Sequence, residues 1–158
     1  AVADRGSRGR RRSPDTVAIM DLERFVTAQD GGGTYRRAVA ELRNGRKTGH
    51  WMWFVFPQIA GLGRSATAQA YAISDLAEAQ AYLGHAVLGP RLIECAEIVA
   101  SQHGLSAEQI FGGIDAIKLR SSMTLFARAD PEQAIFSQVL DQYFDGPDPE
   151  TERRLQPS

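Results

Sequence analysis

The chain has 158 residues, 43% of them hydrophobic, which suffices for one domain with a single buried core. Its richest apolar run, residues 51–56, is about a third of the length that a membrane-spanning helix requires, so we expect a soluble protein without a membrane span. Cys95 is the only cysteine, which excludes an intramolecular disulfide and indicates a cytoplasmic location.

The formal net charge of −1 is unevenly distributed. Residues 1–19 carry five arginines against two aspartates, a balance of +3, whereas residues 20–158 carry 13 basic and 17 acidic residues, a balance of −4. The basic stretch has almost no apolar surface to bury, so we predict a disordered leader over residues 1–19 and a single helical domain over residues 20–158. Its arginines could contact nucleic acid, but a solvated tail or translated upstream sequence is the favoured interpretation, with Met20 as a natural start.

Apolar residues at helical spacing and regular capping residues predict helices along the rest of the chain. Asp21 is expected to cap a first helix that the glycines at 31–33 end, and Thr34 a second helix that ends before Asn44-Gly45. The later segments expected to be helical are 65–71, 74–84, 91–103, 106–111, 115–129, a helix with Pro131 in its first turn, and a short piece from Asp148. No strand pattern competes, so the sequence predicts an all-α, compact bundle of about seven helices.

The stretch HWMWFVFPQ at residues 50–58 contains both tryptophans of the chain. A short apolar run suits a buried strand or a buried helix, but a lone strand would have no partner here, so we expect a buried helix over 50–56 that Pro57 ends. Most of its ring area is expected in the core, and the buried indole N–H of Trp51 needs an acceptor. The polar His50 and Gln58 at its ends indicate an aromatic-walled pocket for a flat ligand.

Basic residues precede the aromatic stretch HWMWFVFPQ along the chain. A basic cluster is expected at the rim of such a pocket, where it would favour an anionic ligand, or else on an ordinary solvated helix face. Lysine is rare in this chain, and Lys47 lies just before HWMWFVFPQ while Lys118 begins a second unusual stretch. The compact ammonium of a lysine suits binding to a phosphate, and in a dry pocket it can serve as a titratable amine. The basic cluster consists of Arg36, Arg37, Arg43, Arg46 and Lys47.

The second unusual stretch is KLRSSMTLF at residues 118–126. Lys118, Ser121 and Ser122 are related by i+3 and i+4, so an ammonium and two hydroxyls are expected on one side of a helix. The alternative is that the hydroxyls bond back to their own helix. No specific nucleophile motif is present, and Gly61 to Ser65 lacks both the Walker lysine and the dinucleotide fingerprint.

The segments HWMWFVFPQ, GLGRS, LGPRLIEC and KLRSSMTLF occur in the order of a known family. Over residues 21–155 the chain resembles domain of unknown function 1810, a family of small bacterial proteins sometimes mislabelled calpastatin. The resemblance implies an all-α single domain and no established activity. Shorter matches at 62–64, 88–94 and 111–112 resemble the ADP-ribose-associated glycosidase-like family and favour a nucleotide-like ligand.

We therefore expect a pocket that binds or processes a small anionic, ring-bearing metabolite or nucleotide derivative. No cofactor, membrane or nucleic-acid partner is expected. No metal site is expected either, because each of the three histidines is more than fifteen residues from the next along the chain. The alternative is a non-enzymatic helical interaction or oligomerisation module; the oligomeric state and any reaction stay open. The candidate catalytic residues are Lys118 and His50, and the candidate ligand-binding residues are Trp51, Trp53, Gln58, Lys47, Ser121 and Ser122.

Overall fold

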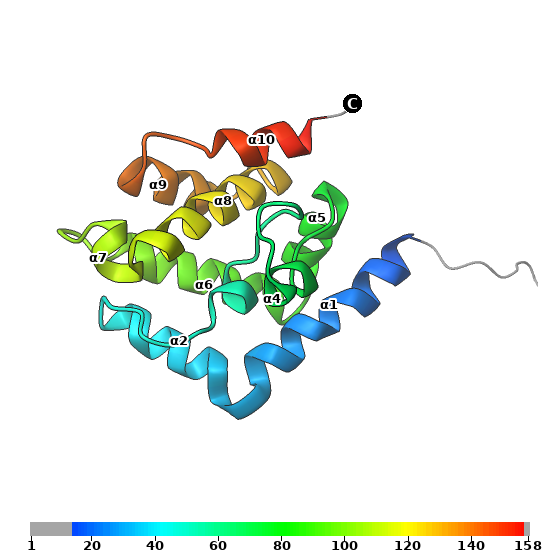
Figure 1. Cartoon of the computed structure of the whole chain (residues 1–158), viewed down its shortest axis with the longest axis horizontal. Helices are drawn as coiled ribbons and strands as arrows, with labels where there is room; N and C mark the ends of the chain where they lie inside the picture. The colour runs from blue at the N-terminus through cyan, green and yellow to red at the C-terminus, as the bar shows by residue number, and fades with distance from the viewer. Residues whose placement is uncertain (1–13, 157–158) are drawn as a thin grey trace, which may run out of the picture.

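Figure 1 shows the computed structural model of the chain, which describes residues 14–156. The described residues form packed helices without a strand, and a single isolated parallel bridge joins Ile59 to Ile73. The predicted all-α single domain is confirmed, and the helix number is close to the expected one. The elements are α1 (Pro14–Asp30), the 3-10 helix η1 (Gly31–Gly33), α2 (Thr34–Arg43), α3 (Met52–Val55), α4 (Ala66–Ala70), α5 (Leu76–Gly84), α6 (Leu88–Ala100), α7 (Ala107–Phe111), α8 (Gly113–Ala129), α9 (Ala134–Tyr143) and α10 (Pro149–Leu155).

The helices surround one hydrophobic core. α8 packs against α5, α7, α9 and α10, and α6 packs against α2, α5 and α9. α1 and α2 form a V joined at η1, with α10 on the opposite side of the molecule (Figure 1). In the core, the Tyr82 ring lies 5.2 Å from that of Phe25 and 5.3 Å from that of Phe126, at tilted or edge-on angles that aromatic pairs favour.

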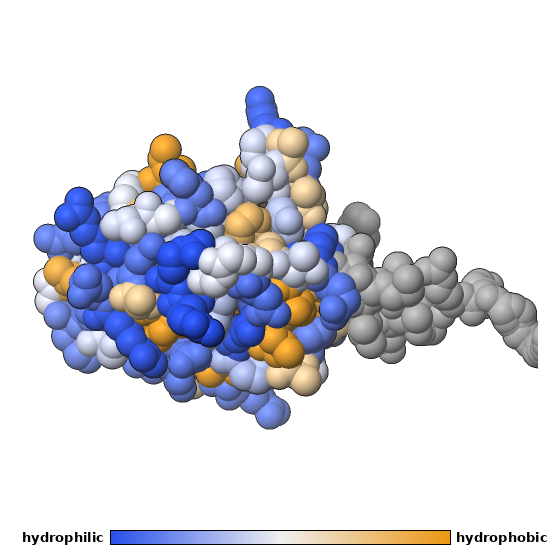
Figure 2. Space-filling model, turned by 90° about the horizontal axis from the view of Figure 1, so that it is seen from below, coloured by the Kyte–Doolittle hydropathy of each residue, from blue (hydrophilic) through white to orange (hydrophobic). Residues whose placement is uncertain are grey.

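The surface is mixed in polarity. On the face seen from below, hydrophobic residues form separate small patches among hydrophilic ones (Figure 2). None of the helices within residues 14–156 is both long enough and apolar enough to cross a membrane.

The start of α1 differs from the sequence prediction. The helix begins at Pro14, so Asp21 lies inside it and does not cap it. The backbone of residues 14–19, which we expected in the leader, is helical, whereas residues 1–13 lie outside the described part of the chain. Proline is accepted in a first helical turn, and residues 15–20 contain no glycine or second proline that would end a helix.

The boundaries of α9 and α6 also differ from the sequence prediction. α9 begins at Ala134, so Pro131 lies in a turn before the helix, where Asp130 accepts a hydrogen bond from the backbone N–H of Glu132 (3.2 Å). α6 begins at Leu88, so Gly89-Pro90 lies in its first turn, as proline permits. Because α6 ends at Ala100, the expected extension to residue 103 is wrong: Ser101 and the residues after it turn away.

Candidate functional site

The aromatic stretch is divided between the core and a cavity. The predicted helix is present but short, since α3 covers only Met52–Val55. Trp51, with 2% of its surface exposed, and the fully buried Phe56 belong to the core. Their rings lie 6.3 Å apart, and Phe56 meets Phe111 edge-on at 6.0 Å. Trp53 is only partly buried, so one of the two indoles is available to a ligand.

Glu41 fixes the loop that leads into α3. Its Oε1 accepts hydrogen bonds from the backbone N–H groups of Thr48 (2.8 Å) and Gly49 (2.9 Å) and from the indole N–H of Trp51 (2.8 Å). Burial opposes ionisation of Glu41, but these donors outweigh burial and lower its pKa below the ordinary value. Glu41 is therefore the acceptor that the buried indole requires, a role that its place in a basic cluster did not indicate.

Both lysines of the chain share one carboxylate. The Lys47 ammonium lies 2.6 Å from Asp115 Oδ2, and the Lys118 ammonium lies 3.3 Å from Asp115 Oδ1. Each ammonium also stands over an indole, Lys47 at 5.1 Å from the ring centroid of Trp51 and Lys118 at 4.4 Å from that of Trp53. The two unusual stretches therefore meet through Asp115, a residue that the sequence did not single out.

Beside this cluster lies a cavity of about 480 Å³. It is bordered by one face of α8, by the chain between α3 and α4, and by the start of α10. On α8 the lining residues are Ile114, Ile117, Lys118 and Ser121, whose i, i+3, i+4 and i+7 spacing places them along one side of the helix. The remaining lining residues are Trp53, Gln58, Leu62, Gly63, Arg64, Ser65, Ala68, Asp148 and Glu150.

The cavity brings together half of the predicted site. Trp53, Gln58, Lys118 and Ser121 all line it, although they come from segments sixty residues apart in the chain. The Lys118 side chain is 22% exposed, so its ammonium can exchange one partner for another. The Ser121 hydroxyl lies 3.2 Å from a backbone carbonyl oxygen of its own helix, in the back-bonded arrangement that was the alternative, and 3.3 Å from Asp148 Oδ2.

The other four predicted residues lie elsewhere. Trp51 is in the core, and the Lys47 side chain is only 7% exposed, with its ammonium donating to a backbone carbonyl as well as to the shared carboxylate. Ser122 is fully buried, and its hydroxyl has no hydrogen-bond partner among the described residues. His50 is exposed and does not line the cavity.

The charged residues at the edge of the cavity differ in whether they have ion-pair or hydrogen-bond partners. Arg64 is exposed at its edge and makes no ion pair with any residue that the structure describes. Asp148 Oδ2 is occupied by the backbone N–H of Thr151 (2.9 Å) and its hydroxyl (2.6 Å) as the cap of α10. Glu150 pairs with Arg154 at 3.0 Å and with the neighbouring arginine. The carboxylates thus have partners, whereas Arg64 has no ion-pair partner in the part of the chain that the structure describes.

The basic cluster on α2 is not part of this cavity. Arg36, Arg37 and Arg46 are exposed, and Arg43 lies 3.5 Å from Glu94. None of the four arginines lines the cavity, so their expected place at its rim is wrong. They follow the solvent-facing side of α2 and its C-terminal end, which agrees with the alternative of a solvated helix face.

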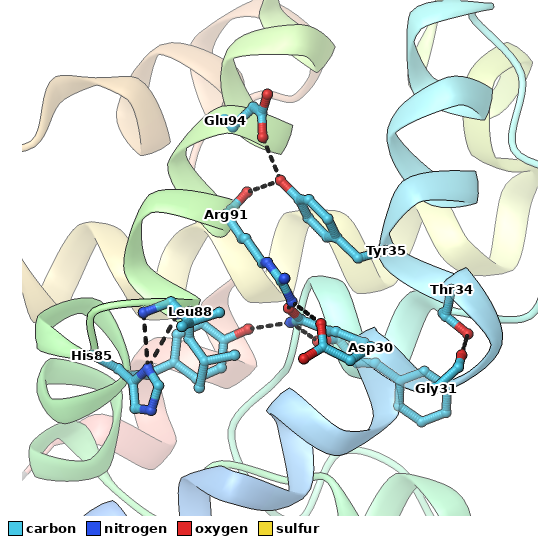
Figure 3. Close-up of polar contacts among 12 residues, drawn as sticks. Asp30, Gly31, Thr34, Tyr35, His85, Leu88, Arg91 and Glu94 are labelled. Atoms are coloured by element: carbon cyan, nitrogen blue, oxygen red, sulfur yellow. Dashed lines mark hydrogen bonds and ion pairs between the residues drawn. The ribbon is translucent and has the colours of Figure 1, made fainter.

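A second polar cluster joins α1, α2 and α6 (Figure 3). The Arg91 guanidinium lies 2.9 Å from Asp30 and 3.1 Å from the side-chain oxygen of Gln29, and stands 4.5 Å from the ring centroid of Tyr35. The Tyr35 hydroxyl donates to Glu94 at 2.5 Å. Every charged group in this cluster has a partner, so we interpret it as a structural network that ties the three helices together.

The remaining reactive groups do not form a site. Burial raises the pKa of Cys95 to about 12, against the opposing effect of a hydrogen bond with Tyr35, so its thiol is protonated and inert at neutral pH. Among the side chains that the structure describes, those of residues 22–156, no three from histidine, cysteine, aspartate or glutamate are grouped closely enough to hold a metal ion.

Comparisons with known proteins place the chain among uncharacterised relatives. The family model described as "Protein of unknown function (DUF1810)" matches residues 19–155. The crystal structure of the conserved hypothetical protein Rv1873 from Mycobacterium tuberculosis is 53% identical in sequence, with a TM-score of 0.85 over 89% of this chain and 99% of that one. None of the curated proteins compared matches the chain.

Proposed function

The chain belongs to the DUF1810 family of proteins of unknown function, and we propose that its cavity beside α8 binds a small anionic, ring-bearing ligand. The observation that carries the proposal is the Lys118 ammonium, which is partly exposed, stands over Trp53 and lines a cavity of about 480 Å³. Small-molecule pockets combine apolar walls with a few convergent polar groups, at volumes of about 300 to 1,000 Å³.

The polarity of the lining supports this ligand class. Trp53, Leu62 and Ala68 offer apolar surface, and Gln58 offers an amide with donors and an acceptor. Lys118 shares its carboxylate with a second lysine, so the charge on its ammonium is only partly balanced. An incoming anion therefore finds an attractive group without having to break a full ion pair.

Processing of the ligand would depend on Lys118. It is the only side chain on the cavity's α8 face with an amine that could donate a proton to a bound substrate. His50, the other candidate acid or base, is exposed outside the cavity and is not part of the proposal. Binding of the ligand does not depend on catalysis and can be measured without it.

Thermal-shift measurements against nucleotides and related anionic metabolites test the proposal. A ligand at a hundred times its dissociation constant adds about 2.7 kcal/mol to the free energy of unfolding. We expect at least one ring-bearing anion to raise the melting temperature of the wild type, and Lys118→Gln to abolish that rise. Arg36→Gln, a substitution on the exposed side of α2, is the control and should keep it. No shift with any compound, or a full shift in Lys118→Gln, would overturn the proposal.

A second candidate function is supported by exposed apolar side chains. Ile114 and Ile117 are 75% and 67% exposed, and Leu105 is 36% exposed. Exposed isoleucines one helical turn apart suit a protein-interaction or oligomerisation module. Light scattering over a range of protein concentrations distinguishes the two functions: self-association that Ile117→Ser abolishes would favour the module, whereas a monomer at all concentrations would count against self-association.

A further inference from the structure

The proposed ligand site has a cationic part and an apolar part, and their residues indicate a narrower ligand class. We propose that the cavity selects phosphate monoesters of ring compounds, with the doubly charged phosphate at Arg64 and Lys118 and the ring against Ile114 and Ile117. This inference rests on the proposed function, and it adds both the charge of the ligand and its orientation.

The charge follows from the groups around the cavity. The charged lining residues, the residues ion-paired with them, and Lys47, which shares Asp115 with Lys118, together comprise five cations and three carboxylates, a formal balance of +2. A phosphate monoester carries about −1.5 to −2 at neutral pH, whereas a phosphate diester, a sulfate ester or a carboxylate carries a single charge. A dianion therefore matches this balance better than a monoanion. The cations are Lys47, Lys118, Arg64, Arg153 and Arg154, and the carboxylates are Asp115, Asp148 and Glu150.

Two of these cations are available to a ligand. Lys47 is almost fully buried, and both C-terminal arginines are held by Glu150. Arg64 has no ion-pair partner among the described residues, and Lys118 makes the longer of the two contacts with the shared carboxylate. Guanidinium can bind two phosphate oxygens at once, and ammonium acts as a compact point charge, so together they suit a terminal phosphate.

The position of the ligand ring follows from the apolar surface that remains accessible in the cavity. One face of the Trp53 ring has the Lys118 ammonium 4.4 Å from its centroid, so a ligand ring cannot take that face without displacing the cation. Ile114 and Ile117 line the same cavity and are the two most exposed large hydrophobic residues of the described chain. A ligand ring lying against them would remove this apolar surface from water.

The spacing of the two parts fits one small molecule. Ile114 and Lys118 are four residues apart on α8, which is about 6 Å along the helix axis. The ring and phosphate of a nucleoside monophosphate are separated by a sugar, so such a compound can reach both parts at once. A free base or nucleoside would reach only the apolar part, and inorganic phosphate only the cationic part.

Calorimetric titration with matched ligands tests the charge assignment. For one nucleoside, the 5′-monophosphate, the cyclic monophosphate and the uncharged nucleoside carry the same ring but different charge. We expect the monophosphate to bind at least tenfold more tightly than the cyclic compound, and the nucleoside to bind more weakly still. The preference should shrink as the pH falls below about 6, where the monoester takes up a proton. Equal affinities for the two phosphates, both higher than that for the nucleoside, would overturn the dianion inference while leaving the proposed function intact. Equal affinities for all three compounds, or no binding by any of them together with no hit in the thermal-shift screen, would overturn both.

Paired substitutions test the orientation of the ligand. Arg64→Gln should lower the affinity for the monophosphate and for inorganic phosphate by at least tenfold each. The double variant Ile114→Ser with Ile117→Ser should lower only the affinity for the monophosphate. All three side chains are exposed, so the variants are expected to fold, and their urea midpoints check this. Arg36→Gln again serves as the control and should bind like the wild type. If the isoleucine variant loses as much affinity for inorganic phosphate as for the monophosphate, or loses affinity for neither, the placement of the ligand ring is wrong.

Discussion

Replacing Glu41 tests whether a single carboxylate holds the loop before α3. Glu41 Oε1 accepts three hydrogen bonds, and one of them comes from the indole N–H of Trp51, a side chain only 2% exposed. Glu41→Ala leaves that N–H buried without an acceptor, whereas the two backbone N–H groups can be hydrated. Glu41→Gln keeps a neutral acceptor of nearly the same shape.

The expected magnitudes differ between the two variants. A buried donor left without a partner costs about 1 to 3 kcal/mol, and each lost bond to a charged acceptor adds to this, so we expect Glu41→Ala to lose about 3 kcal/mol. Hydrogen bonds to a neutral acceptor are about half as strong as those to a charged one, so Glu41→Gln should lose about 1 kcal/mol. In a domain of this size, 3 kcal/mol corresponds to about 9 °C in melting temperature.

The pH dependence gives a sharper check. Because the folded pKa of Glu41 lies below its ordinary value of 4.5, its contribution to stability is complete above pH 4.5 and is lost as the pH falls through the folded pKa. Urea unfolding followed by tryptophan fluorescence should therefore show wild type and Glu41→Gln differing at pH 7 and converging in acid. A difference that stays constant down to pH 3, or equal losses in the two variants at pH 7, would refute the reasoning.

Three further predictions concern packing and burial. Asp115→Asn leaves the Lys47 ammonium, 7% exposed, without its carboxylate; urea unfolding should show a loss of about 3 kcal/mol that adding Lys47→Met largely reverses, and an unchanged midpoint would contradict this. Gly89→Ala places a Cβ 2.1 Å from a backbone carbonyl oxygen at the end of α5 and should lower the melting temperature, whereas Gly84→Ala, with nothing within 4 Å, should not; equal melting would disprove the steric argument. Because burial raises the Cys95 pKa to about 12, a disulfide reagent at pH 8 should label it only after unfolding in urea, and rapid labelling of the folded protein would show that it is accessible.

The starts of several helices could be predicted from the sequence because a capping residue and the backbone group it binds lie close together in the chain. Ser65 caps α4, and Ser106 caps α7 in a complete capping box with Gln109, since the donor and acceptor lie within one turn of each other. Asp148 caps α10 for the same reason, with proline at the first helical position. The segment expected to begin at Ser74 is capped instead by the next residue, Asp75, a difference of one residue that is common at helix ends.

The composition of the cavity depends on tertiary packing and could be predicted only in part. Ser121 and Ser122 both fall within one turn of Lys118, yet one lines the cavity and the other is sealed in the core. Adjacent helical residues point in directions about 100° apart, and the packing of α8 against its neighbours decides which of them is covered. The pattern also gave no reason to expect Ile114 and Ile117 in solvent, because large apolar residues on a helix are normally assigned to its buried face.

The pairing of lysines with tryptophans explains why one short stretch holds so much ring area. The indole of Trp51 covers the buried Lys47 side chain, and Trp53 lies under the partly exposed Lys118, while Asp115 contacts both ammonium groups. An ammonium is compact enough to fit between an indole face and a carboxylate, whereas a planar guanidinium would demand a wider site and a second acceptor. The buried pair fixes Asp115, and Asp115 in turn holds Lys118 at the cavity. A ligand anion that binds Lys118 would thus complete a chain of alternating charges whose inner end is anchored in the core.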